Sequence, residues 1–217
     1  MVWTIINRLL GWVGIAIYAA LVYEMLRLWI SPQANEVDRI ATLAVMMAFE
    51  FIMVHSGVFM AALPRKFTIF FFVPFYGIFA LIFNSLAPGN EILYLYMGVV
   101  FMRMRFAFSD ADEATKAASV IMSILAVFIY FVLVFIFAFG AALVPRLGLT
   151  EAFLEMAGYA NAHNSGGIFI DYPHVPLAMG TVYFTLLAMS EVWVFKLFST
   201  KLPARGEINS GTGSSRH

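Results

Sequence analysis

The sequence predicts an all-α, polytopic integral membrane protein: a bundle of six transmembrane helices with both termini in the cytoplasm. Composition is the first reason, because 62% of the 217 residues are hydrophobic and only 12% are charged, whereas soluble domains carry about 25% charged residues. The apolar residues also form blocks of roughly 20, the length that crosses a hydrocarbon core about 30 Å thick. Finally, lysine and arginine gather in alternate connections, as the positive-inside rule requires.

Prolines and polar turns separate these blocks. Ser31 and Pro32 end the first span, because proline cannot continue a helix, and Pro64 ends the second. Pro74 lies inside the third span, where it predicts a kink at the carbonyl of Phe70. The predicted spans are about 3–30, 40–63, 67–87, 92–108, 117–144 and 177–198, and the Gly- and Ser-rich tail at 203–217 is predicted to be disordered.

The connection at 145–176 is the only long one, and the topology places it outside. Within it, Thr150 is expected to cap a short helix that ends at Gly158. Ten of the 13 lysines and arginines fall on the inner side of this topology, and the three on the outer side are Arg27, Arg39 and Arg146. This bias predicts the orientation and is typical of a bacterial inner (plasma) membrane protein.

Three ionisable residues lie inside predicted spans, where a charge costs several kcal/mol unless it is solvated or paired. Glu50 and His55 belong to the second span and Glu191 to the sixth. His55 and Glu191 are expected at a similar depth, so a hydrogen bond or ion pair between them is feasible, whereas Glu50 points about 140° away from His55 around the helix. One interpretation is a proton or ion pathway. The other is that these residues only form hydrogen bonds between packed helices.

The outer loop contains a second candidate site. His163, Asp171 and His174 carry side chains that ligate zinc, copper or iron, and the spacing Asp171-x-x-His174 allows both to face one ion. A Gly-rich loop with two histidines and one acid is more often simply solvated or packed. The chain has no cysteine, which excludes disulfides, thiolate metal sites and cysteine nucleophiles. The sequence firmly implies no cofactor.

Basic residues suggest a third, weaker site. Arg103, Arg105 and Lys116 lie near a predicted membrane boundary, where they bind anionic lipid head groups or only set the topology. Glu24 and Arg27 are spaced i, i+3 near the outer end of the first span, which predicts a local ion pair.

Three functions are compatible with these residues. The first is a small transporter or channel-like protein with a polar path through Glu50, His55 and Glu191. The second is a membrane-embedded enzyme or redox protein with a metal near the outer face, and the third is a non-catalytic subunit or assembly factor. Six spans are few for a complete permeation pathway, so a homo-oligomer or another membrane subunit is an expected partner, besides the lipid bilayer. The net charge of zero gives no indication of nucleic-acid binding.

Overall fold

The computed structural model describes residues 2–62, 65–87, 89–94, 96–97, 113–161 and 166–200, and this part of the chain is helical with short connections and contains no strand. Three of its helices are long and apolar enough to cross a membrane: α1 (Val2–Ile30) through Gly11–Ile30, α6 (Glu113–Phe139) through Val120–Phe139, and α9 (His174–Thr200) through His174–Trp193. The predicted helical class is therefore confirmed, and these helices indicate a membrane protein.

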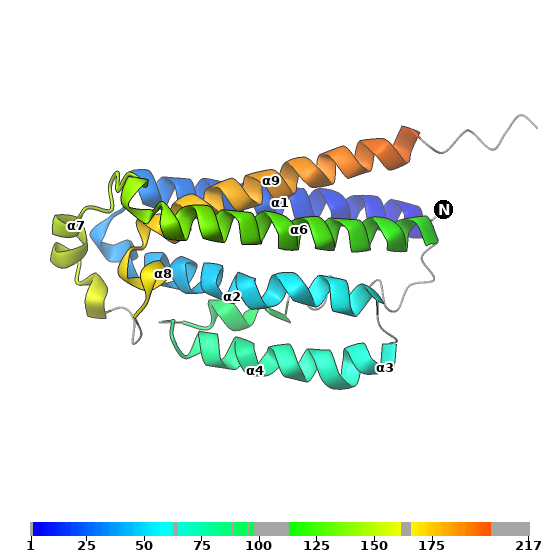
Figure 1. Cartoon of the computed structure of the whole chain (residues 1–217), viewed down its shortest axis with the longest axis horizontal. Coiled ribbons are helices and arrows are strands. Elements are labelled where there is room, and N and C mark those ends of the chain that lie inside the picture. Colours follow the sequence, from blue (N-terminus) through cyan, green and yellow to red (C-terminus); the bar gives the residue numbers. More distant parts are fainter. Residues whose placement is uncertain are drawn as a thin grey trace, which may run out of the picture.

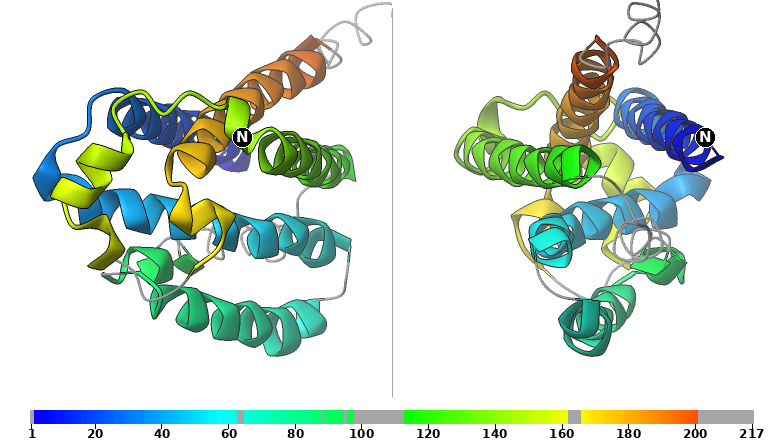
Figure 2. Two further views of the ribbon diagram at one scale, coloured as in Figure 1. Left: turned by 60° about the vertical axis from the view of Figure 1, so that its left-hand side comes forward. Right: turned by 90° about the vertical axis from the view of Figure 1, so that its right-hand side faces the viewer.

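The long helices form a layered bundle (Figures 1 and 2). Helix α9 packs between α1 and α6, and α2 (Val37–Ala62) lies beneath them in contact with α6 and α9. On the other side of α2 lies α4 (Val73–Asn84). Helices α1, α4 and α6 run in one direction and α2 and α9 in the opposite one, so the start of α1 and the end of α9 lie at the same end (Figure 1). We call this the terminal end, and the opposite end, with connections 31–36 and 140–173, the loop end.

The core is densest toward the loop end. Residues 40–47 of α2 and 174–180 of α9 are buried without interruption. Gly180 permits this close packing, because a Cβ at this position would lie 2.4 Å from Met25 Sδ and 2.9 Å from Met47 Sδ. Small residues allow membrane helices to approach in this way. Toward the terminal end α9 becomes exposed, as Met189 and Trp193 show with exposed fractions of 63% and 61%.

Prolines act on the helices partly as expected. Helix α1 ends at Ile30, immediately before Ser31 and Pro32. Pro74 lies in the first turn of α4, and the chain before it forms the short helix α3 (Arg65–Phe67) and a π-helical turn, η2 (Thr68–Phe72). Because Pro74 has no N–H for the carbonyl of Phe70, the wider π turn accommodates the interruption that the sequence predicted as a kink.

The predicted outer loop is largely structured. It contains α7 (Glu151–Met156), η4 (Tyr159–Asn161) and α8 (Ile168–Asp171), and it is preceded by η3 (Ala141–Leu143), which falls within the predicted fifth span. Thr150 caps α7 as expected, since its side chain accepts a hydrogen bond from the Phe153 N–H at 3.2 Å. Helix α9 begins three residues before the predicted start of the last span at 177, because Pro176 is tolerated in the first turn of α9, where its missing N–H would have no helical partner.

The loop end is tied to α1 by two hydrogen bonds. Trp29 Nε1 donates to the carbonyl of Pro145 at 2.8 Å, and the N–H of Gly148 donates to the carbonyl of Trp29 at 3.0 Å. Gly148 packs so closely that a Cβ there would lie 2.6 Å from the carbonyl oxygen of Ile30 and 2.3 Å from Pro32 Cδ. This contact holds the end of α1 against the chain that follows α6.

Candidate functional site

Glu50 lies at the contact between α2 and α9. Its Oε1 accepts a hydrogen bond from the Tyr183 hydroxyl at 2.9 Å. The Tyr183 side chain is fully buried, and Glu50 is half-buried. This bond joins residues 133 positions apart in the sequence. It therefore connects two helices, α2 and α9, that are not neighbours along the chain.

Tyr130 on α6 completes a cluster around this bond. The Tyr130 and Tyr183 rings meet edge to face, with centroids 5.3 Å apart and planes at 88°. The Tyr130 hydroxyl donates to the carbonyl of Met47, one turn before Glu50 on α2. We call Glu50, Tyr130 and Tyr183 the Glu50 cluster; it joins α2, α6 and α9. Neither tyrosine was predicted as a site residue from the sequence, although a tyrosine deep in an apolar span requires a partner for its hydroxyl.

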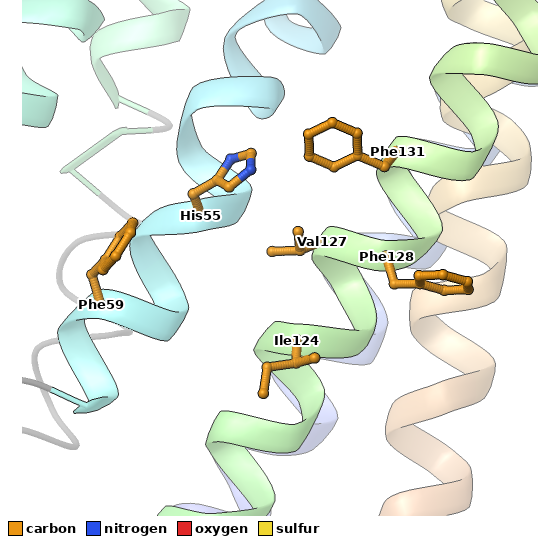
Figure 3. A pocket seen from close by; sticks show the side chains of 6 residues that line it. All are labelled: His55, Phe59, Ile124, Val127, Phe128 and Phe131. Atoms are coloured by element: carbon orange, nitrogen blue, oxygen red, sulfur yellow. The ribbon is translucent and has the colours of Figure 1, made fainter.

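His55 lies elsewhere, in a groove between α2 and α6 toward the terminal end (Figure 3). The groove has a volume of about 430 Å³, and five apolar side chains line it beside the imidazole: Phe59, Ile124, Val127, Phe128 and Phe131. His55 Nδ1 is 2.8 Å from the carbonyl oxygen of Phe51, one turn earlier on the same helix. The ring also meets Phe131 edge to face, with centroids 5.5 Å apart.

Glu191 lies at a third place, where α9 packs on α1. A Cβ added to Gly14 would be 3.3 Å from Glu191 Oε2, so the carboxylate lies directly against the α1 backbone. The three residues predicted to lie in the membrane thus face α9, α6 and α1 respectively. The structure does not bring Glu50, His55 and Glu191 around a common polar cavity, and the contacts of His55 are with Phe51 and Phe131 instead of Glu191.

The predicted metal ligands are described only in part, because His163 lies outside the described residues. Asp171 Oδ2 accepts a hydrogen bond from the Gly167 N–H at 3.0 Å, within its own turn. His174 is buried at the start of α9, with its ring edge to face against Tyr172. In the part of the chain with described coordinates, no three His, Asp or Glu side chains are grouped closely enough to hold a metal ion.

The proposed head-group residues Arg103 and Arg105 also lie outside the described residues, and Lys116 belongs to α6, where its side chain is not among those described. A different charged cluster forms at the loop end. Arg27 Nη2 pairs with Glu24 at 2.9 Å and with Glu36 at 2.7 Å, and Arg39 Nε pairs with the same Glu24 oxygen at 2.7 Å.

This four-residue network extends the Glu24–Arg27 pair that the sequence predicted. Glu36 and Arg39 join it because η1 (Ala34–Glu36) folds the start of α2 back over the end of α1. The hydrogen bond from Arg27 holds the pKa of Glu36 below its usual range. The network therefore fixes the turn between the first two long helices, near the expected membrane boundary.

The described part of the chain is an all-helical bundle with three helices long and apolar enough to cross a membrane, and a half-buried glutamate is hydrogen-bonded at the contact between α2 and α9. Comparison of the chain with protein-family models, curated proteins and solved structures finds no match. The function is therefore argued from the site alone.

Proposed function

We propose that this protein is a small proton-translocating membrane protein in which Glu50 binds and releases the proton. The Glu50–Tyr183 hydrogen bond is the observation that carries the proposal. A carboxyl group in a membrane interior is costly when charged and much less so when protonated, so residues of this kind are typical of proton pathways. The Tyr183 hydroxyl suits both forms, since either a carboxylate or the carbonyl oxygen of a carboxylic acid accepts its hydrogen bond.

His55 and Glu191 are not part of the proposed proton path. Because each faces a different helix, the path expected through all three residues is reduced to the Glu50 cluster. Glu50 is half-buried in α2, and protonation changes the strength of its bond to α9, since hydrogen bonds to a charged acceptor are about twice as strong as neutral ones. Proton binding therefore alters the contact between α2 and α9.

Proton flux into liposomes tests this function. Purified protein is reconstituted around a trapped pH-sensitive dye, and a potassium diffusion potential drives protons inward. We expect the wild type to acidify the lumen faster than empty liposomes, and Glu50→Gln to lower this rate at least about tenfold, because the amide cannot take up the proton. Glu155→Gln, which removes an exposed carboxylate from α7, is the matched control and should keep the wild-type rate.

A second candidate function is a non-catalytic membrane subunit. It is favoured by the way in which the Glu50 cluster joins three helices, which is the role of a structural hydrogen-bond network. The liposome assay separates the two functions. A wild type that conducts no faster than empty liposomes, or a Glu50→Gln variant with the full rate, refutes proton translocation and leaves the structural role.

The finer topology is also a proposal. We propose six spans, with both termini in the cytoplasm of a bacterial inner membrane. The opposite directions of α1, α4 and α6 against α2 and α9 support this arrangement, as does the excess of basic residues on the inner side. The fourth span, predicted at 92–108, accounts for the return from α4 to α6, and only residues 92–94 and 96–97 of it are described.

A further inference from the structure

The ring of Tyr183 must keep one orientation for its hydroxyl to stay on Glu50. The hydroxyl reaches the carboxyl across the contact between α9 and α2, and a hydrogen bond weakens steeply when its donor is turned away. Two aromatic rings hold Tyr183 in place. Phe184, its neighbour on α9, has its centroid 5.0 Å away, and Tyr130 on α6 meets it edge to face at 5.3 Å. Tyr130 therefore supports the bond from a helix that the bond itself does not join.

Tyr130 is in turn anchored to the backbone of α2. Its side chain is fully buried, and its hydroxyl donates to the carbonyl of Met47. A backbone carbonyl has two lone pairs, so Met47 can accept this bond in addition to one within its own helix. The carbonyl does not titrate, so the anchor is the same whether Glu50 is charged or neutral. Tyr130 thus keeps its place while the strength of the Glu50–Tyr183 bond changes with protonation.

The anchor lies one turn from the bond on both helices. Met47 comes three residues before Glu50 on α2, and Gly180 comes three residues before Tyr183 on α9. These two residues touch, since a Cβ added to Gly180 would lie 2.9 Å from Met47 Sδ. One turn of α2 is thus held by α9 through packing and by α6 through the Tyr130 hydroxyl. A displacement of α6 would therefore disturb the alignment between Tyr183 and Glu50.

We propose that Tyr130 is a positioning residue of the Glu50 cluster, which makes the hydrogen bond between Tyr183 and Glu50 depend on the docking of α6. Tyr130 does not donate to Glu50, because its one hydroxyl hydrogen is used on Met47. It acts through the ring of Tyr183. The inference rests on the proposed function for its consequence, namely that movement of α6 away from α2 and α9 regulates proton binding at Glu50.

A residue that only fills space would behave differently. Its removal would lower the stability of the bundle but would leave the interaction between Glu50 and Tyr183 unchanged. Leu133 is the matched control, because it is buried on α6 one turn after Tyr130 and has neither a ring nor a hydroxyl. The two roles are therefore separated by the coupling between Glu50 and Tyr183 and not by the loss of stability.

A triple-mutant cycle measures this coupling in the full-length protein, unfolded by sodium dodecyl sulfate in mild detergent. Glu50→Leu and Tyr183→Phe, made singly and together, should show a coupling factor of about tenfold in the unfolding equilibrium. In a Tyr130→Leu background we expect this factor to fall below about twofold, and in Tyr130→Phe, which keeps the ring but loses the anchor, to be intermediate. Leu133→Ala should leave the factor unchanged. An unchanged factor in Tyr130→Leu, or an equal reduction by Leu133→Ala, overturns the proposal.

A spectroscopic measurement covers the case in which Tyr130→Leu does not fold. The protein carries 3-fluorotyrosine at position 183, and its fluorine NMR spectrum is recorded in detergent micelles. We expect one dominant resonance in the wild type and additional resonances in Tyr130→Phe, because the lost anchor permits further orientations of the Tyr183 ring. One dominant resonance in Tyr130→Phe as well overturns the proposal. Neither measurement needs proton transport, so a wild type that conducts no protons refutes the proposed function and leaves the positioning role to be judged by itself.

Discussion

Removal of the Tyr183 hydroxyl measures how strongly the Glu50 cluster holds α2 to α9. Hydrogen bonds between membrane helices contribute about 0.6 kcal/mol on average and about 1.7 kcal/mol at most. The Glu50–Tyr183 bond should lie in the upper part of this range, because its donor is fully buried and its acceptor is a carboxyl group. We expect Tyr183→Phe to lower the free energy of unfolding by about 1 to 1.7 kcal/mol, roughly a tenfold change in the unfolding equilibrium.

A double-mutant cycle isolates this bond from the other contacts of both residues. Unfolding is followed by circular dichroism as sodium dodecyl sulfate is added to the protein in mild detergent. In a Glu50→Leu background the acceptor is gone, so Tyr183→Phe should then cost less than about 0.3 kcal/mol. Tyr23→Phe, at an exposed position of α1, controls for the loss of a hydroxyl. The same large cost in both backgrounds would refute the assigned bond.

Two further predictions concern the charged network and the topology. Arg27 lowers the pKa of Glu36 in the folded protein. The stability that this pair contributes is therefore complete above pH about 4.5 and is lost as the pH falls through the lowered pKa. Arg27→Gln should flatten this pH dependence of the free energy of unfolding, measured in unfolding titrations between pH 7 and 3. For the topology, an impermeant maleimide applied to intact spheroplasts should label Gln33→Cys and Ala160→Cys but not Lys66→Cys. The cysteine-free parent is the blank, and labelling at all three positions would exclude the six-span arrangement.

Local signals predicted two particular features of the helices. The Ser31-Pro32 pair correctly marked the end of α1, and the side chain of Thr150 caps α7 as expected. Such features depend on a few neighbouring residues, which is why the sequence reveals them. Helix α9 begins before the predicted span at 177 because a proline such as Pro176 interrupts the interior of a helix but is tolerated in its first turn.

The site depends on which helices touch, and depth along a span does not determine this. A bond between His55 and Glu191 was considered feasible because the second and sixth spans run in the same direction, which places both residues at a similar depth. In the structure His55 faces α6, and Glu191 lies against Gly14 of α1. Tyr183, eight residues before Glu191 on α9, is the residue that reaches α2. Each span is apolar around most of its circumference, so periodicity leaves the rotation of each helix undetermined.

The two hydrogen bonds that join Trp29 to Pro145 and Gly148 have a consequence for how the bundle can move. Because α1 is hydrogen-bonded to the chain after α6 at the loop end and the first turns of α9 are buried there, we expect less relative movement of the helices at this end than at the terminal end. A rearrangement of the bundle should therefore pivot at the loop end and separate the helices at the terminal end. His55 and Glu191 lie in the parts of α2 and α9 that would separate. Gly148, which has no space for even one methyl group, lies at the pivot.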